Sequence, residues 1–285
     1  MRGRVVVWGL LVGLAAVGCG AGVDGKDVVV EGTPPATPYA GPLDIATKDL
    51  DASTPEALRS VSGAAGRALE CDGEISWGGG PDGWSESDGG DTPEEGLRLW
   101  FDLFEPTGPR SGFRVERASG DRVLYSYDVT GRTKVAVVVA RDQEDRPGWG
   151  PETHASCDPA ELPASVTGSG DPEIWTDRHG KRVATTTVSS YPGAEHCDWQ
   201  SAHFLVMGRG EDRRQYVRDP DGVIEENLLT SPYDGDAEMP ADAHDTGYRH
   251  GERRLWLTDD ASTAYVRTSG GVEAWPLAKT TVACM

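Results

Sequence analysis

Apolar and polar positions divide the chain into an apolar opening, a stretch without a period, and a long region of short strand patterns. Residues 5–17 carry no charge and follow Arg2 and Arg4. From residue 20 to residue 52 the apolar positions follow neither the helical nor the strand period. Beyond residue 53, short apolar runs recur between clusters of Gly, Pro, Asp and Ser, which predicts a folded body rich in strands.

The first part of this body, residues 53–162, combines helical and strand patterns. A capping residue followed by proline and glutamate starts a helix at residue 53 and again at residue 92. Strand patterns follow at residues 113–117, 122–127, 134–140 and 148–156. These patterns predict an α+β domain of two helices and an antiparallel meander, with residues 77–91 as an exposed loop between the helices.

The second part, residues 173–285, carries almost only strand patterns and follows a small-residue linker at 163–172. Two hairpins and a terminal meander are predicted from alternating runs at residues 173–177 with 181–189, 204–208 with 213–218, and 253–258, 264–268 and 272–276. The predicted fold class is therefore α+β, an N-terminal α+β domain followed by a mostly antiparallel β domain.

The apolar opening has the three-part layout of an export signal. It falls short of the roughly 20 apolar residues that a membrane-spanning helix needs. Ala16-Val17-Gly18-Cys19 resembles the lipobox of bacterial lipoproteins. The resemblance implies that residues 1–18 are a signal peptide and that Cys19 is lipidated, for example with palmitate. An ordinary secretory signal cut nearby is the alternative.

A lipidated Cys19 places the protein outside the cytoplasm, anchored to the outer face of the cell membrane. Residues 19–52 are then expected to be the lipidated N-terminus and a flexible acidic tether, because their composition buries too little apolar surface to order the chain. More than one acyl chain on the cysteine suits a stable anchor, since a single chain binds a membrane only marginally.

The cysteine count agrees with the lipobox. The five cysteines are Cys19, Cys71, Cys157, Cys197 and Cys284. Lipidation of Cys19 leaves an even set of four, which are candidates for disulfides in an exported protein. Four cysteines allow three pairings, and pairing within each part of the body is the expectation we favour.

Charge excludes some partners. Removing residues 1–18 takes away two of 27 basic residues and none of 47 acidic residues, which leaves a net charge of −22 on 267 residues. Nucleic-acid binding needs clustered Lys and Arg, so no nucleic-acid partner is expected. The expected partners are the membrane, through the lipid at Cys19, and an unknown envelope protein or saccharide.

No catalytic signature stands out, so no catalytic residue, metal ligand or cofactor is assigned. The alternative is an exported hydrolase in the β-rich domain that uses His196 or His203 with Asp198 or Asp219. Cys197, next to His196, is expected to form a disulfide rather than to act as a nucleophile.

A third hypothesis is a calcium-dependent binding module, because two groups of acids offer carboxylate oxygens. The groups are Asp82, Glu86, Asp88 and Asp91, and Asp219, Asp221 and Glu225. Neither follows the EF-hand spacing. We expect these acidic turns to be solvated.

The second part also resembles uncharacterised actinobacterial lipoproteins, a similarity that implies no particular activity. It rests on the segments 196–200, 216–220, 246–249, 255–257, 264–266 and 275–276. Four tryptophans lie there at strand positions, Trp175, Trp199, Trp256 and Trp275. We expect them mostly in the core, although an exposed pair would suit a saccharide or peptide. The function predicted is a lipid-anchored cell-envelope lipoprotein with a non-catalytic binding or structural role.

Overall fold

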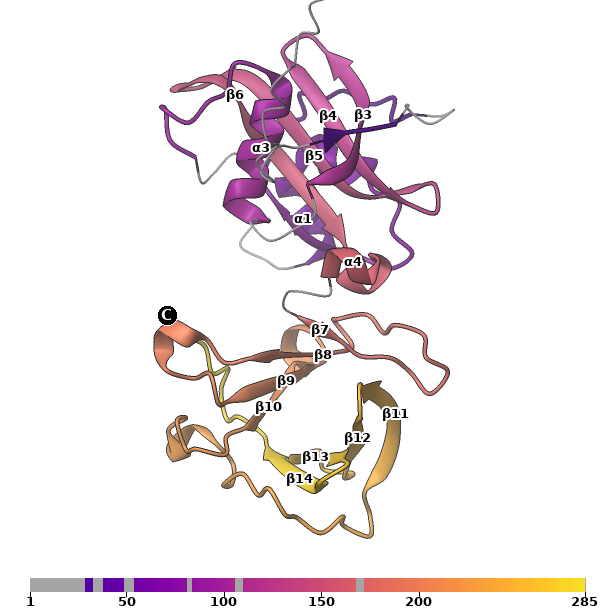
Figure 1. Ribbon diagram of the computed structural model, residues 1–285, viewed down its shortest axis with the longest axis vertical. Coiled ribbons are helices and arrows are strands. Elements are labelled where there is room, and N and C mark those ends of the chain that lie inside the picture. The colour runs from indigo at the N-terminus through magenta and orange to yellow at the C-terminus, as the bar shows by residue number, and fades with distance from the viewer. Residues whose placement is uncertain are drawn as a thin grey trace, which may run out of the picture.

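The computed structural model describes residues 29–32, 38–48, 54–80, 84–105, 110–167 and 172–284. Within these ranges the fold is mixed α and β, and strands in three mainly antiparallel sheets dominate it (Figure 1). The α-helices are α1 (Pro55–Val61), α2 (Gly63–Ala68), α3 (Pro93–Phe104) and α4 (Ala164–Thr167). Short 3-10 turns are η1 (Pro159–Glu161), η2 (Glu195–Cys197), η3 (Gly210–Asp212) and η4 (Glu226–Leu228).

A six-stranded sheet organises the first part of the chain. Its order is β1-β3-β4-β5-β6-β2, and every pair except β1–β3 is antiparallel. The strands are β1 (Val29–Val30), β2 (Ile75–Gly79), β3 (Ser111–Ser119), β4 (Arg122–Val129), β5 (Arg132–Gln143) and β6 (Arg146–Cys157). The expected meander is confirmed, and β1 and β2 extend it at its two edges.

Helix α3 covers one face of this sheet. Its N-terminus forms the expected capping box, in which the Thr92 hydroxyl accepts from the Glu95 amide and the Glu95 carboxylate accepts from the Thr92 amide. Trp100 and Phe101 then pack on alternate strand residues such as Tyr125. The other residues of this core are Leu97, Phe113, Val123, Val135, Val137, Val139 and Leu162.

The opposite face is covered by α1, α2 and residues 38–48. Ala64 and Ala65 of α2 pack on Leu124 and Val138. The unbroken apolar run in β5 follows from this arrangement, because a strand buried on both faces has no polar side. The helical pattern from residue 53 gives two helices rather than one, with Ser62 between them.

Residues 29–32 and 38–48 differ from the tether that the sequence predicts. Val29 and Val30 pair with β3, and Leu43 is only 4% exposed in the core beneath α2. The backbone amide of Tyr39 donates to the Glu116 carboxylate, 2.5 Å away. The described residues of this segment therefore belong to the fold. Its apolar residues follow no helical or strand period, but Val29 and Val30 pair at the sheet edge and Leu43 packs on a sheet face.

The expected loop at residues 77–91 also contributes to packing. Its first residues belong to β2, and Trp84 is 4% exposed with its indole nitrogen donating to the Pro151 carbonyl at 3.1 Å. Gly150 allows this approach, since a Cβ there would lie 2.4 Å from the Trp84 ring. The glycine-rich composition of this segment predicted a loop and gave no sign that Trp84 is buried.

Two four-stranded sheets make up the second part. One has the order β10-β9-β8-β7 and the other β11-β12-β13-β14. The strands are β7 (Glu173–Ile174), β8 (Val188–Pro192), β9 (His203–Met207), β10 (Arg214–Arg218), β11 (His244–His250), β12 (Arg253–Leu257), β13 (Thr263–Thr268) and β14 (Gly271–Pro276). The β9–β10 hairpin and the β12–β14 meander are confirmed, whereas β11 was not expected.

The core of the second part lies between its two sheets. Trp175 and Tyr216 from the first sheet region pack with Leu255 and Trp275 from the other, and all four are fully buried. Isolated bridges between Thr176 and Arg249 and between Tyr216 and Leu277 connect the sheets. Trp175 and Trp275 are thus core residues, as expected, whereas Trp199 and Trp256 are only partly buried.

The segment between the two parts is partly helical. Of the linker expected at 163–172, residues 164–167 form α4. Arg182 donates to the Leu162 carbonyl at 2.7 Å and to the Thr167 hydroxyl at 2.7 Å, and Arg209 pairs with Glu74. These contacts connect residues before and after the linker.

Candidate functional site

The densest polar cluster of the second part centres on the carboxylate of Glu173. This carboxylate lies 2.9 Å from His203 Nε2 and 2.7 Å from Arg253 Nη2. His250 Nδ1 is 3.9 Å from the same oxygen and 2.6 Å from Arg253 Nη2. The four residues come from β7, β9, β12 and β11, so strands of both sheets contribute.

A buried serine completes this cluster but is not placed as a nucleophile. Ser190 is fully buried, accepts from the Trp175 indole nitrogen at 2.9 Å and donates to Glu173. The Ser190 hydroxyl therefore already accepts one hydrogen bond and donates one, and it donates to the Glu173 carboxylate rather than to the His203 imidazole. This geometry is that of a structural network.

The electrostatics agree with a structural role for the cluster. Burial alone raises the pKa of the Glu173 carboxyl, but hydrogen bonds from His203 and Ser190 and the charge of Arg253 outweigh burial and hold that pKa well below its ordinary range. Burial lowers the pKa of His250. Glu173 therefore stays ionised as the shared anion of the cluster.

The histidine–acid pairs expected for a hydrolase do not form. His203 meets Glu173, not Asp198 or Asp219. The Asp219 carboxylate accepts from two backbone amides of the following turn, at 2.9 and 2.8 Å. His196 Nε2 instead lies 3.0 Å from Cys284 Sγ.

The acids suggested for calcium do not converge in the described residues. Asp88 accepts from the Ser85 amide at 3.1 Å and Asp219 caps its own turn, while Asp82 lies outside the described residues. One group in the described chain has metal-ligand spacing, namely His196, Cys197 and Cys284. Its two sulfurs are joined in a disulfide, so it offers no pair of thiolates.

Both disulfides join cysteines within one part of the chain, which is the pairing expected from the sequence. Cys71 is bonded to Cys157 with the Cα atoms 5.3 Å apart, and Cys197 to Cys284 with 6.2 Å. Cys157 is fully buried at the end of β6, whereas the second pair is partly exposed. Cys19 lies outside the described residues.

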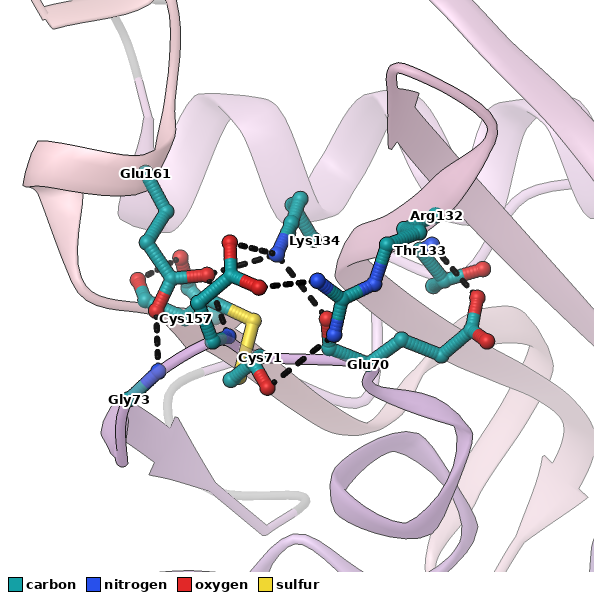
Figure 2. The surroundings of a disulfide bond; sticks show 10 residues. Glu70, Cys71, Gly73, Arg132, Thr133, Lys134, Cys157 and Glu161 are labelled. Carbon is teal, nitrogen blue, oxygen red and sulfur yellow. Dashed lines mark hydrogen bonds and ion pairs between the residues drawn. A yellow bond between two sulfur atoms is a disulfide. The ribbon is translucent and has the colours of Figure 1, made fainter.

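Figure 2 shows charged side chains gathered around the first disulfide. Lys134, 2% exposed, donates to the Glu70 carbonyl at 2.9 Å, to Asp72 at 3.2 Å and to Glu161 at 2.6 Å. Glu161 also accepts from the amides of Asp72 and Gly73. All three donors of the ammonium group are used, so these contacts hold residues 70–73 against β5 and η1.

The first part also contains a pocket with aromatic walls, between α3, the sheet and the residues around α4. The space open to the centres of water molecules is about 40 Å³. Its aromatic lining residues are Trp77, Trp100, Phe101, Phe113 and Tyr127. Adjacent rings lie 4.8 to 6.3 Å apart, as in the Trp77–Trp100 and Trp100–Phe101 pairs, which are ordinary packing distances.

Polar groups at this pocket are few. Glu105, immediately after α3, is half-buried and lines the pocket, and burial raises its pKa. The Trp100 indole nitrogen is buried without a hydrogen-bond partner in the described residues. The His154 ring lies against Trp77, with the two ring centroids 4.3 Å apart. Burial lowers the pKa of His154 to about 4, so its imidazole is neutral at neutral pH.

The sequence placed the tryptophans of the second part mostly in the core, with an exposed aromatic pair as the alternative, and the aromatic pocket lies in the first part. The helical spacing of Trp100, Phe101 and Phe104 predicted only a core face. One local signal was available, because Glu105 places an acid at the end of a helix that has no basic residue in its last turn. Trp77 reaches the pocket through β2, which glycine-rich sequence concealed.

No protein family, curated protein or solved structure matches the chain. Within the residues that the structure describes, no helix combines the length and apolar character needed to cross a membrane. Geometry points to the aromatic pocket as the candidate functional site, because it is concave and keeps Glu105 and the Trp100 indole N–H without partners in the described residues.

Proposed function

We propose that the chain is an exported lipoprotein, anchored through a lipid on Cys19 to the outer face of the cell membrane, with a non-catalytic binding role. The observation that carries this proposal is that four of the five cysteines form two disulfides. The two disulfides use Cys71, Cys157, Cys197 and Cys284, which leaves Cys19, at the end of the lipobox-like segment, as the fifth cysteine. Two long-range disulfides also suit an oxidising compartment outside the cytoplasm.

A binding role is supported by how the charged groups are used. All three ammonium donors of Lys134 are occupied, and one carboxylate oxygen of Glu173 accepts from Ser190, His203 and Arg253. The aromatic pocket, in contrast, keeps an acid and an indole N–H without partners in the described chain. We place ligand binding at that pocket, with an envelope protein or saccharide as the source of the bound group.

We further propose that residues 53–162 and 173–285 are two domains, an α+β domain and a β-rich domain. Their hydrophobic clusters are separate, since Leu97 and Leu124 belong to clusters of the first range and Leu205 and Val217 to clusters of the second. Each disulfide closes within one range. The segment at residues 29–48 joins the first domain through β1 and Leu43.

Replacing Cys19 with alanine should move the protein from the membrane fraction to the soluble or unprocessed fraction. The reason is that the acyl chains attach to this sulfur, and each buried methylene contributes about 0.8 kcal/mol to membrane binding. Fractionation and mass spectrometry of the native protein measure the effect. Ala16→Leu is the matched control, because leucine is the commoner residue at that lipobox position, and it should stay anchored.

Two results contradict the anchor. One is an unmodified mature N-terminus at a residue other than Cys19. The other is a Cys19→Ala protein that stays in the membrane fraction to the same extent as the wild type.

A further inference from the structure

The aromatic pocket is narrow, and its size limits what it accepts. A volume of about 40 Å³ for water centres corresponds to roughly three water positions, since one water needs about 10–15 Å³. Trp77 and Trp100 form part of its walls, and Val135 and Leu162 add aliphatic surface. An unbranched chain fits this space, whereas a flat sugar ring or a bulky trimethylammonium group does not, so of the two sources proposed above an envelope protein suits the pocket better than a saccharide.

Glu105 is an anion without a partner among the described residues. Its carboxylate makes no hydrogen bond or ion pair with the part of the chain that the structure describes. It also follows the C-terminus of α3, where the helix dipole already favours cations, and the last turn of α3 contains no basic residue. The guanidinium of Arg110 lies over the Phe101 ring, 5.7 Å from its centroid, but pairs with Asp102 at 2.6 Å.

These features select the charge of a ligand. An anionic group would meet the Glu105 carboxylate and the acidic protein as a whole, which carries 47 acidic and 27 basic residues. A neutral group would leave Glu105 half-buried and unpaired. A cation pairs with the carboxylate, interacts favourably with the aromatic rings and compensates the negative end of α3.

We propose that the pocket binds a primary ammonium group on an unbranched aliphatic stem, as in a lysine side chain or another alkylamine. In this arrangement the ammonium donates to Glu105 and the stem contacts Trp77 and Trp100. This inference rests on the proposed binding role, and it adds the chemical class of the ligand.

The direct test uses the mature, disulfide-bonded chain and compares n-butylamine with 1-butanol, which have one shape and different charge, and with tetramethylammonium, which is charged but wider. n-Butylamine, 1-butanol and tetramethylammonium are titrated at neutral pH, with tryptophan fluorescence and calorimetry as readouts. We expect n-butylamine to bind at least about tenfold more tightly than 1-butanol, because a hydrogen bond to a charged group is worth that factor or more. Tetramethylammonium should bind weakly because it is too wide.

Substitution of Glu105 locates the effect. Glu105→Gln should reduce n-butylamine affinity about tenfold or more and leave 1-butanol affinity unchanged. Glu56→Gln is the matched control, since it removes the same charge from an exposed position on α1, across the sheet. Amine binding by the wild type should also weaken as the pH falls through the raised pKa of Glu105, because protonation removes the anion.

The outcomes separate the two proposals. Equal affinity for n-butylamine and 1-butanol, or an amine affinity unchanged in Glu105→Gln, would overturn the ammonium assignment and leave a pocket that binds apolar chains. Failure of all three probes to bind the wild type would overturn the binding role of the pocket as well. The wild-type comparison decides even where the variant does not fold.

The unpaired Glu105 carboxylate should lower the stability of the ligand-free protein. Glu105→Gln should raise the melting temperature at neutral pH by about 2 °C, because it removes a half-buried unpaired charge. A carboxyl whose folded pKa is raised destabilises the fold increasingly as pH rises from the unfolded to the folded pKa, so the difference should disappear in acid. Thermal melts across the acid range measure this, and a lower melting temperature would indicate a structural role.

Discussion

Replacing Cys71 and Cys157 together with alanine should lower the free energy of unfolding by about 5 kcal/mol. The disulfide closes a loop with a sequence separation of 86, for which the chain-entropy model gives about 4–5 kcal/mol. Loss of the fully buried Cys157 sulfur adds to this. The Lys134 clasp, meaning the hydrogen bonds of Lys134 to Glu70, Asp72 and Glu161, also loses the covalent bond that fixes residue 71 beside it (Figure 2).

The second disulfide is the internal control, because its sequence separation of 87 gives the same entropic contribution. Replacing Cys197 and Cys284 together with alanine should lower the free energy of unfolding by less than the first double substitution does. The reason is that both of these cysteines are partly exposed. Denaturant unfolding, read separately by fluorescence and circular dichroism, measures both losses. Equal losses would show that burial and the clasp contribute nothing beyond chain entropy.

Glu173→Gln should destabilise the protein by about 3 kcal/mol at neutral pH. Removing one partner of a partly buried charge cluster leaves the others without compensation, and here Arg253 loses an ion pair of 2.7 Å. His203 and Ser190 lose their shared acceptor at the same time. The loss should be measurable as a shift of the denaturant midpoint.

The pH dependence of this loss has a defined sign. The folded-state pKa of Glu173 is depressed, so its stabilising effect is complete above the unfolded carboxyl pKa of about 4.5 and is lost as pH falls toward the folded value. The deficit of Glu173→Gln should therefore shrink near about pH 3. Glu226→Gln, at an exposed position, should change little at either pH. A deficit that is constant with pH would contradict an ionised Glu173 at the centre of the cluster.

Much of the secondary structure was predictable because it depends on local patterns. The capping box at Thr92 and Glu95 starts α3 as expected, and the apolar alternation of β9, β10 and the terminal meander gives the predicted hairpins. Strand β11 was missed because its residues, such as Asp245 and Gly247, are polar or flexible and its pairing with β12 is irregular.

The aromatic pocket and the Glu173 cluster were less predictable because their groups meet across long separations. Glu173 and Arg253 are 80 residues apart, and Trp77 reaches Trp100 only because β2 pairs with the last strand of the meander. Pairing each histidine with an acid close to it in sequence, such as His196 with Asp198, predicted the wrong contacts. Side-chain contacts between strands follow sheet order, and the sequence pattern of a single strand does not contain that order.

The parallel pairing of β1 with β3 has a consequence for distance from the membrane. With Cys19 lipidated, as proposed, Val29 lies ten positions after the anchor, and a chain of that length reaches at most about 35 Å. The thirty-odd residues of the expected tether would reach about three times as far. The edge of the six-stranded sheet would then be confined to a shallow layer above the lipid, and any partner engaged at the aromatic pocket would have to lie within that layer or extend into it.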